Sequence, residues 1–479
     1  MKIFLGNAPW RKNGFYGVRA GSRWPHFEQE GECYMPFPFF LAYATALLER
    51  EGFEVLLVDG IAADLSDEEF VSRCVDFNPQ LVLLEVSTPS INQDLAITKK
   101  IKSRLNVPIA YAGPHHWMYE PSFLEQHPLV DYVLVGEYEF TLLELVQKLN
   151  QGQEPQGILG TIHRTPQGIE VNPRRPLMED LDLFPWPARH QLPMMRYNDT
   201  PGGIPAPSLQ MWASRGCPYH CVFCAWPQIM YGGHKYRIRS PEDVVNEIAW
   251  CLQAYDYKSI YFDDDTFNIG KSRILNIAAL MKERGINRPW AIMARADLMD
   301  YQTLKELKEA GLVALKYGVE SGDQEVLNRS GKGLNLAMVK KVVKMTRELG
   351  IKHHLTFSFG LPGENIKTIG KTIKLALDLD PDSLQFSITT PFPGSTYFEM
   401  LDQAGALIHK DWEKYDGYSR AVFNSPECSA KMLEQALHNA NKAWKWHTLK
   451  KRLKTDPISL MSDILSNPID NFRRFRRWS

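Results

Sequence analysis

Residues 212–226, WASRGCPYHCVFCAW, place three cysteines within a span of eight positions. Cys217, Cys221 and Cys224 directly follow the apolar run LQMWAS, which is typical of a buried strand. Structural zinc sites use four protein ligands, usually two close pairs separated by a longer loop, whereas this stretch has no fourth cysteine. Three thiolates in one loop suit a cubane of four irons and four sulfides, because such a cluster can leave one iron free to bind another molecule.

Two other interpretations of the three cysteines remain open at this point. His220 could complete a zinc site, although its place immediately before Cys221 would strain one coordination sphere. Buried structural cysteines are the other possibility, but a loop flanked by Arg-Gly and Cys-Pro is a poor place for apolar burial. The spacing therefore favours a cluster.

Length and composition describe a multidomain protein of near-neutral charge. At 479 residues the chain is long enough for two or three domains, each with its own core. Its 55 basic and 56 acidic residues give a net charge of −1, so bulk charge does not favour nucleic acid as a partner. The 44% hydrophobic and 23% charged residues are typical of a soluble globular protein.

The sequence predicts a cytoplasmic protein. The N-terminal run MKIFLGNAPW is too short for a secretory signal, and no stretch of about 18 consecutive apolar residues predicts a transmembrane segment. The seven cysteines are an odd number, and three of them share one loop. That pattern fits a reducing compartment and metal binding better than a disulfide framework.

Residues 1–150 alternate short apolar runs with helix-length amphipathic segments, which predicts a flavodoxin-like parallel sheet wrapped by helices. The five expected strands are KIFLGN (2–7), FEVLLVD (53–59), QLVLLEV (80–86), VPIAYAG (107–113) and DYVLVG (131–136). Ligands bind beyond the carboxyl ends of such strands, so the loops there are candidate binding loops. Ordinary βα turns remain the alternative for any one of these loops.

The rest of the chain divides into three further parts. Residues 151–205 lose the alternation and carry four prolines in RRPLMEDLDLFPWPARHQLP, which predicts a linker or a strap. Residues 206–410 resume the alternation and predict a partial (β/α)6 barrel with its chemistry at the carboxyl ends of the strands. Residues 411–479 are expected to be mainly helical and possibly substrate-related. Their tail NFRRFRRWS is expected to be an exposed end, with a surface anchor as the alternative.

Six apolar runs mark the strands of the expected barrel. They are LQMWAS (209–214), SIYFDDD (259–265), PWAIMAR (289–295), VALKYGVES (313–321), HLTFSFG (354–360) and LQFSITT (384–390). Helical segments lie between them, with Ser240 as an expected N-cap and Gly350 as an expected helix end.

The motif CPYHCVFC resembles the Cys-x3-Cys-x-aromatic-Cys signature of radical S-adenosylmethionine (SAM) enzymes. The resemblance implies that the three cysteines hold a [4Fe-4S] cluster whose open iron chelates the amino and carboxylate groups of SAM. An electron from the reduced cluster then cleaves the S–C5′ bond and gives a 5′-deoxyadenosyl radical. The resemblance also implies that Phe223 packs near the adenine and that His220 is a bystander.

Segments at the ends of the later strands resemble SAM-contacting positions of the same family. YFDDDTF (261–267) offers carboxylates for the methionine ammonium, and Asp264 and Asp265 are equal candidates. An acidic helix-capping turn is the alternative for this segment. Arg295 could meet the SAM carboxylate, which suits an arginine fork. The resemblance implies further contacts to the ribose hydroxyls and the adenine, from Glu320, Ser321 and Gly360.

A flavodoxin-like sheet ahead of such a barrel resembles the cobalamin-binding class of the family, over roughly residues 1–415. AGPHH (112–116), VGEYEFTLLEL (135–145) and DLDLFPWPAR (180–189) carry this resemblance. It implies cobalamin contacts from Ser87, Thr88, Gly113, Gly136 and Glu137. The Asp-x-His-x-x-Gly motif that supplies a histidine to cobalt in cobalamin mutases is absent. No protein histidine ligand to cobalt is therefore expected, and His115 and His116 have no assigned role.

The resemblance implies a methyltransferase as the leading activity. One SAM would methylate cob(I)alamin, and a second would give the radical that removes hydrogen from an unactivated carbon, which then takes the methyl group. The first alternative is an oxidative cyclase or rearrangement enzyme without methyl transfer, related to the anaerobic magnesium-protoporphyrin monomethyl ester cyclases and hopanoid-modifying enzymes. A non-enzymatic corrinoid sensor and a zinc-bound interaction module are alternatives of other classes.

The expected partners are a small-molecule or lipid-like substrate and an electron donor such as flavodoxin or ferredoxin. Residues 11–40 are rich in aromatic side chains and arginine, which suits a bulky, partly anionic or lipid-like substrate. Packing of this segment over the cobalamin is an equal alternative.

Overall fold

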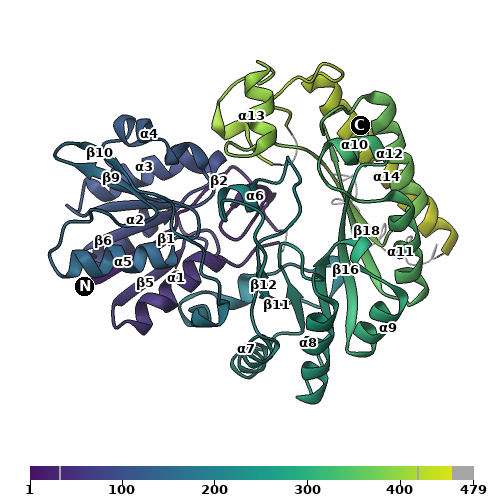
Figure 1. Ribbon diagram of the computed structural model, residues 1–479, viewed down its shortest axis with the longest axis horizontal. Coiled ribbons are helices and arrows are strands. Elements are labelled where there is room, and N and C mark those ends of the chain that lie inside the picture. The colour runs from purple at the N-terminus through teal and green to yellow at the C-terminus, as the bar shows by residue number, and fades with distance from the viewer. Residues whose placement is uncertain (32–33, 418–419, 456–479) are drawn as a thin grey trace.

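Two sheets organise the computed structural model, which describes residues 1–31, 34–417 and 420–455. A seven-stranded sheet is built from residues 2–171, and a six-stranded parallel sheet from residues 208–388. The two sheets lie side by side, each with its own helices (Figure 1). The predicted tail NFRRFRRWS lies outside the described residues.

The first sheet confirms the flavodoxin-like prediction. Its strand order is β10-β9-β8-β7-β6-β1-β5, and the five strands from β5 to β8 are parallel. β1 lies between its neighbours in register, so that Gly6 pairs with Val58 on one side and Leu84 on the other. The strands are β1 (Lys2–Asn7), β5 (Glu54–Asp59), β6 (Leu81–Glu85), β7 (Ile109–Ala112), β8 (Tyr132–Leu134), β9 (Thr161–Thr165) and β10 (Gly168–Val171).

Alternate side chains of this sheet enter two separate cores, as the period of a strand requires. Ile3 and Leu5 belong to the core that holds α1 (Phe39–Arg50) and α5 (Glu139–Asn150). Phe4, between them, belongs to the core that holds α2 (Asp67–Phe77), α3 (Ile91–Lys102) and α4 (Pro121–Gln126). Both faces of the sheet are therefore covered by helices.

Two small β structures were not expected from the sequence. Part of the 151–205 stretch that we predicted to be a linker forms the hairpin β9–β10, which adds two antiparallel strands to the first sheet. Its turn is short, because Pro166 and Gln167 separate the strands and Gly168 takes a positive φ of 132°. The segment after β1 forms a three-stranded sheet of β2 (Arg11–Lys12), β3 (Phe15–Val18) and β4 (His26–Gln29).

The second sheet confirms the partial barrel. Its order is β11-β14-β15-β16-β17-β18, every pair is parallel, and β11 and β18 are its two edges. The strands are β11 (Ser208–Met211), β14 (Ser259–Phe262), β15 (Trp290–Ala294), β16 (Leu312–Glu320), β17 (Lys352–Phe359) and β18 (Ser383–Ile388). The helices that follow them in the chain are α7 (Pro241–Ala254), α8 (Lys271–Glu283), α9 (Tyr301–Glu309), α10 (Gln324–Arg329), α11 (Leu336–Glu348), α12 (Ile366–Leu379) and α13 (Thr396–Gln403).

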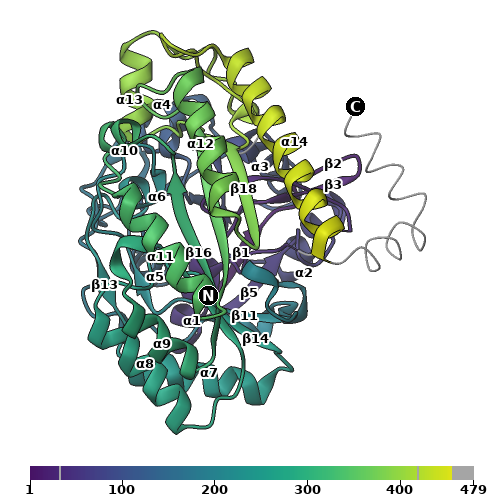
Figure 2. The ribbon, with the colours of Figure 1, turned by 90° about the vertical axis from the view of Figure 1, so that its right-hand side faces the viewer.

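The expected helix signals are present. The Ser240 side chain accepts a hydrogen bond from the Asp243 N–H and so caps α7. Gly350 follows α11 with a φ of 65°, as expected for a helix end. The C-terminal region is helical as predicted, and its long helix α14 (Ala430–Thr455) lies along α12 and the edge strand β18 (Figure 2).

The amino-terminal end of the barrel is filled by the strap that precedes it. Ile204 packs in a small core with Tyr261, Ala291 and Ala314 from the inside of the barrel. A Cβ on Gly202 would lie 2.6 Å from the Ala314 Cβ, so only glycine allows this approach. The opposite, carboxyl end of the barrel is left for the chemistry.

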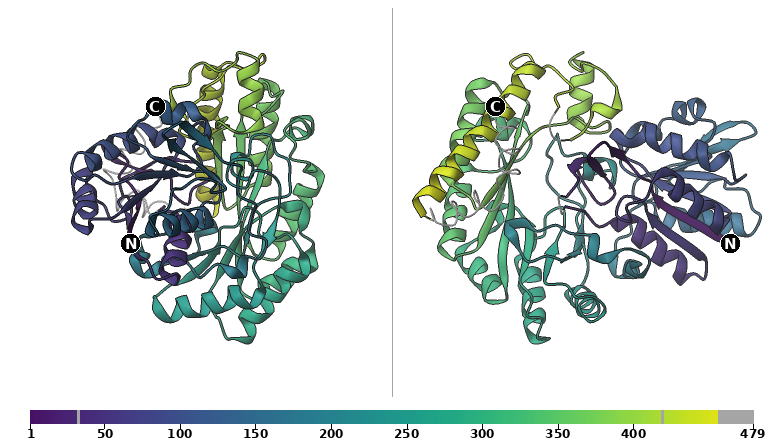
Figure 3. Two further views of the ribbon diagram at one scale, coloured as in Figure 1. Left: turned by 60° about the vertical axis from the view of Figure 1, so that its left-hand side comes forward. Right: turned by 180° about the vertical axis from the view of Figure 1, so that it is seen from behind.

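An ion cluster joins the two sheets next to the cysteine motif. Arg215, two positions before Cys217, donates to Glu137 at 3.2 Å and to Glu139 at 2.8 Å, and both glutamates follow β8 of the first sheet. Arg237 also donates to Glu137, at 2.7 Å. The four side chains are at most 6% exposed. The segment of β2–β4 also lies between the sheets (Figure 3).

No helix of the described residues is long and apolar enough to cross a membrane.

We predict that Glu137→Gln lowers the free energy of unfolding by about 3 kcal/mol, because it leaves Arg237 and Arg215 buried without one of their carboxylates. Thermal and denaturant unfolding of the purified protein measure this. Glu68→Gln is the control, since Glu68 is 60% exposed and its pair with Arg104 lies on the surface. Equal destabilisation by the two variants would contradict a role of Glu137 in joining the sheets.

Candidate active site

A cavity of about 200 Å³ lies at the carboxyl end of the barrel strands. The three cysteines of the motif border it, together with the ends of β14, β15, β16 and β18. Seven of the residues predicted to bind the cluster or SAM therefore share one cavity: Cys217, Cys221, Cys224, Phe223, Asp265, Arg295 and Glu320.

Backbone contacts hold the cysteine loop in place. Gly216 has a φ of 88°, and a Cβ there would lie 1.9 Å from the Lys235 carbonyl oxygen. On the other side, the Val222 N–H donates to the Ser330 carbonyl at 3.0 Å. Main-chain contacts from two directions therefore orient the loop before any cofactor binds.

The three thiols suit an iron–sulfur cluster. All three are free cysteines that face the same cavity, and iron–sulfur clusters bind thiolates. Burial raises the pKa of Cys217, Cys221 and Cys224, and the positive charge of Lys332 opposes this shift at each of them. His220 is exposed and its ring packs against that of His234, with centroids 4.0 Å apart.

The structure separates the two aspartates that the sequence left equal. Asp265 borders the cavity, where its carboxylate accepts from the Gly216 N–H at 2.9 Å and from Arg23 at 2.7 Å. Asp264 is fully buried and accepts from Ser214 and from the Ala213 N–H. Burial raises the pKa of Asp264 to about 6. Asp265 is therefore placed to meet a cofactor, and Asp264 to hold the strand ends.

Arg295 borders the cavity in a fixed orientation. Its guanidinium donates to both oxygens of Asp297, at 3.0 and 2.8 Å, and to the Lys332 carbonyl. The Tyr219 ring lies against it, with the guanidinium carbon 3.5 Å from the ring centroid. Tyr219 lies between Cys217 and Cys221 in the sequence. The cysteine loop, which we also call the cluster loop (residues 215–224), and Arg295 therefore hold each other in place.

Glu320 lies at the end of β16 beside a lysine that the sequence analysis missed. It has a positive φ of 69°, rare for a residue with a side chain, and Lys332 donates to its carboxylate at 2.9 Å. Lys332 is 8% exposed and also borders the cavity. Its position in SGKG, after a short helix, gave no signal in the sequence.

The remaining predicted SAM contacts lie apart from the cavity lining. Ser321 is fully buried and packs against Thr372, with the two hydroxyl oxygens 3.3 Å apart. Gly360 has a φ of 87°, and a Cβ there would lie 2.9 Å from Phe423. Its carbonyl accepts from the Tyr397 hydroxyl at 2.6 Å. Phe223, by contrast, borders the cavity and is 5% exposed.

Arg23 reaches the cavity from the first part of the chain. It donates to Asp265 and also to Asp263, at 2.9 Å, and to the Asp263 carbonyl. The segment 11–40, whose role the sequence left open, therefore contacts the barrel mouth directly. No sequence signal linked Arg23 to aspartates 240 positions away.

Two of the predicted cobalamin contacts lie in the loop after β6. Ser87 and Thr88 are 2% and 1% exposed. The Thr88 hydroxyl lies 3.2 Å from Nδ1 of His115, which is fully buried. Burial lowers the pKa of His115 to about 3, so its ring is neutral near pH 7.

The other predicted cobalamin contacts follow β7 and β8. A Cβ on Gly113 would lie 2.3 Å from the Val86 carbonyl, and one on Gly136 would lie 2.2 Å from Arg174. Tyr119 joins the two loops, because its hydroxyl donates to the Gly113 carbonyl and accepts from the Gly136 N–H. Both carboxylate oxygens of Glu137 accept hydrogen bonds from Arg237, so this side chain links the two sheets.

Comparisons with known proteins match both halves of the chain. Residues 36–146 match the B12 binding domain, and residues 213–376 match the Radical SAM superfamily. An uncharacterized methyltransferase of Pyrococcus horikoshii is 32% identical over 381 residues, which cover 79% of this chain and 81% of that protein. The chain belongs to the cobalamin-binding radical SAM family.

A more distant relative of this cobalamin-binding radical SAM enzyme is named as a cyclase and not as a methyltransferase. The anaerobic magnesium-protoporphyrin IX monomethyl ester cyclase of Rubrivivax gelatinosus is 26% identical, over 84% of this chain and 70% of that protein. In fold, the chain resembles the cobalamin-dependent S-adenosylmethionine radical enzyme OxsB, with a TM-score of 0.73 and 15% identity, over 99% of this chain and 71% of that one.

The cofactors of this radical SAM enzyme are a [4Fe-4S] cluster, SAM and cobalamin. The residues present fit the first two: three thiols, a carboxylate, an arginine and an aromatic ring border one cavity.

We predict that alanine at Cys217, Cys221 or Cys224 prevents assembly of the four-iron cluster, because each thiolate holds one corner. Iron and sulfide counts after anaerobic reconstitution, with the visible absorbance of the cluster, measure this. Cys74→Ala is the control, since it removes a buried thiol of α2 outside the cavity. A variant that keeps a full iron count would contradict the assignment of its cysteine.

We also predict that Asp265→Asn weakens SAM binding by about tenfold or more, because it removes a charge that faces the cavity. Asp264→Asn is the comparison, and there the main loss is stability, about 1–3 kcal/mol, since its partners are buried. Equilibrium binding of SAM and thermal unfolding separate the two effects. A larger loss of SAM affinity in Asp264→Asn would reverse the assignment.

Proposed function

We propose that the protein transfers a methyl group from SAM, by way of cobalamin, to an unactivated carbon of a small-molecule substrate. The observation that carries this proposal is the meeting of the two sheets beside one cavity. Glu137 and Glu139, after β8, pair with Arg215 of the cluster loop, and Arg23, from the segment after β1, pairs with Asp265. The carboxyl ends of both sheets, where each type binds ligands, thus lie next to the cluster loop.

When bound, the cofactors supply the bond cleavage and the methyl group, while the protein supplies binding and orientation. Two molecules of SAM and two electrons would convert one substrate C–H group to C–CH3, with release of S-adenosylhomocysteine, methionine and 5′-deoxyadenosine. Both electrons would come from a reduced donor such as flavodoxin or ferredoxin. No protein base is required at the attacked carbon, which agrees with a cavity of fixed ion pairs.

We assign the cavity residues by the charges that they face. Asp265 would meet the methionine ammonium, Arg295 the SAM carboxylate, and Glu320 the ribose hydroxyls, with Phe223 beside the adenine. Each of the three charged side chains is already held by a partner: Arg23, Asp297 and Lys332 respectively. Preorganised groups of this kind bind without further loss of side-chain freedom.

A second candidate is a ring-forming or rearrangement reaction without methyl transfer. It is favoured by the 26% identity to an anaerobic magnesium-protoporphyrin IX monomethyl ester cyclase over 84% of this chain. Its SAM site and cluster would be the same, so the reaction products distinguish the candidates.

We expect the anaerobically reconstituted protein, given SAM and a reductant, to release 5′-deoxyadenosine together with S-adenosylhomocysteine. With its substrate, a methyl-labelled SAM would pass its label to the product. Liquid chromatography with mass detection measures all three, and Cys217→Ala is the control without a cluster.

Release of 5′-deoxyadenosine without S-adenosylhomocysteine, in the presence of a substrate that is consumed, would support the second candidate instead. Cobalamin binding without either product would indicate a corrinoid-binding sensor and would contradict the proposal.

A further inference from the structure

A second cavity, of about 650 Å³, adjoins the one beside the cysteines, which we call the cluster cavity. Its lining comes from β16, β17 and the edge strand β18, from the strap at residues 198–203, and from β4 and α14. The two cavities share part of their lining, including Tyr34, Asp199, Lys316 and Gln385. Lys316 lies four positions before Glu320 on β16, which places it roughly 13 Å below the end of the strand. The second cavity therefore continues away from the cysteines along this strand.

Two strands, β17 and β18, give polar side chains to the wall of the second cavity, which we call the chamber. On β17, His354, Thr356 and Ser358 line one or the other cavity, while Leu355, Phe357 and Phe359 between them are fully buried. On the edge strand β18 the polar residues Ser383, Gln385 and Ser387 line the cavities, together with Leu384 and Ile388. Parallel strands covered on both faces are usually apolar throughout. Some of these polar groups bond to one another: His354 Nδ1 lies 2.9 Å from the Ser383 hydroxyl, and the Ser358 and Ser387 hydroxyls lie 3.2 Å apart. The atoms left without a partner are the ones that indicate a bound molecule.

Some polar atoms of this wall have no partner within the described residues. They are Nε2 of His354, which lines the second cavity, and the hydroxyl oxygen of Thr389, which lines the cluster cavity. Thr389 is 3% exposed. Buried groups of this kind nearly always have a partner, so a bound molecule is the natural source of one.

Lys316 has an ammonium group left for such a molecule. The other basic side chains that line the cluster cavity are in ion pairs. Arg23 pairs with Asp263 and Asp265, Arg295 pairs with Asp297, and Lys332 pairs with Glu320. Among the ion pairs of the described residues, neither Lys316 nor Asp199 has a partner. The two groups are not isolated: burial raises the pKa of Asp199 to about 6, and the charge of Lys316 and a hydrogen bond from the Thr200 N–H oppose this shift. The chamber thus offers a cation and a carboxylate that lie outside the ion pairs of the described residues, with several hydroxyl and amide groups.

We propose that this chamber holds the substrate, and that the substrate is a small hydrophilic molecule whose anionic group, a phosphate, phosphonate or carboxylate, is bound by Lys316. Asp199 would accept a hydrogen bond from a hydroxyl or ammonium group of the same molecule. This rests on the proposed function, which it deepens by naming the substrate class. Of the bulky, partly anionic or lipid-like substrates that segment 11–40 suggested, the proposal favours the anionic kind.

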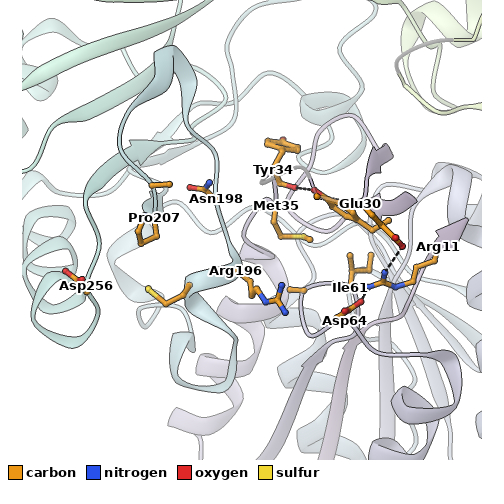
Figure 4. A pocket seen from close by; sticks show the side chains of 15 residues that line it. Arg11, Glu30, Tyr34, Met35, Ile61, Asp64, Arg196, Asn198, Pro207 and Asp256 are labelled. Carbon is orange, nitrogen blue, oxygen red and sulfur yellow. Dashed lines mark hydrogen bonds and ion pairs between the residues drawn. The ribbon is translucent and has the colours of Figure 1, made fainter. Parts of the chain in front are cut away.

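A third cavity shares Tyr34 and Asn198 with the second one. It measures about 910 Å³, and its lining includes the exposed residues Glu30, Asp64 and Asp256. Figure 4 shows Arg11 ion-paired with Glu30 and Asp64, and it shows Tyr34 and Asn198 among the lining residues. Tyr34 borders all three cavities.

The test is a binding titration of the reconstituted holoenzyme with glycerol 3-phosphate and with glycerol, which differ only in the anionic group. We expect saturable binding of glycerol 3-phosphate and none of glycerol over the same concentrations. Lys316→Met should weaken the binding of glycerol 3-phosphate by at least about tenfold, and Lys316→Arg should retain it, since the charge is kept. Lys352→Met is the matched control. Lys352 lies on the same face of β17 as His354, but it is exposed and lines neither the second cavity nor the cluster cavity.

Equal binding of the two probes, no binding of either, or an equal affinity in Lys316→Met and Lys352→Met would overturn the inference. Tight binding of protoporphyrin IX that Lys316→Met leaves unchanged would also overturn it, in favour of a tetrapyrrole. Release of 5′-deoxyadenosine by the wild-type protein is measured separately. If that release occurs without glycerol 3-phosphate binding, only the substrate class is wrong; if it does not occur, the proposed function is wrong.

Discussion

The buried guanidinium of Arg215 is the contact on which the arrangement of the two halves depends. It pairs with two carboxylates of the first sheet and lies over the rings of Phe184 and Tyr43, 4.3 and 4.7 Å from their centroids. A buried arginine is costly without its carboxylates, so displacement of the first sheet from Arg215 would be strongly unfavourable. Only one terminal nitrogen of Arg215 bonds to the glutamates, and the other has no hydrogen-bond partner among the described residues. Because Arg215 lies two positions before Cys217, the same contact that fixes the first sheet also fixes the start of the cluster loop.

A second constraint acts from the opposite side of the cavity. Arg23 leaves the first sheet after β1 and pairs with Asp263 and Asp265 at the end of β14. Arg215 and Arg23 therefore hold the barrel mouth at two places, one from the β8 side of the first sheet and one from the β1 side. The strand ends of the two sheets are therefore held beside one cavity by contacts within the protein itself.

The sequence predicted the elements well because their signals are local. Apolar runs such as FEVLLVD and the N-cap Ser240 depend on neighbouring residues, and the cysteine spacing is itself a local pattern. The contacts that complete the site are long-range. Lys332 meets Glu320 only because the loop after α10 folds back, and Arg23 meets Asp263 across 240 positions. Ion pairs of that kind leave no periodic trace in one sequence.

The polar face of β17 and β18 was partly predictable from the sequence. The alternation of polar and apolar residues is visible in HLTFSFG and LQFSITT, but which face points into the barrel is known only from the fold. Alternating polar and apolar residues usually indicate a strand with one face in water. Here α12 and α14 cover the apolar face, so the polar face must be the one that points inside. Hydrogen bonds between the two strands, His354 to Ser383 and Ser358 to Ser387, offset part of the cost of these inward polar groups. The proposed substrate would supply partners for the atoms that remain. The pattern of two strands thus constrains the chemistry of the substrate, whereas the cysteine motif constrains only the chemistry of the radical.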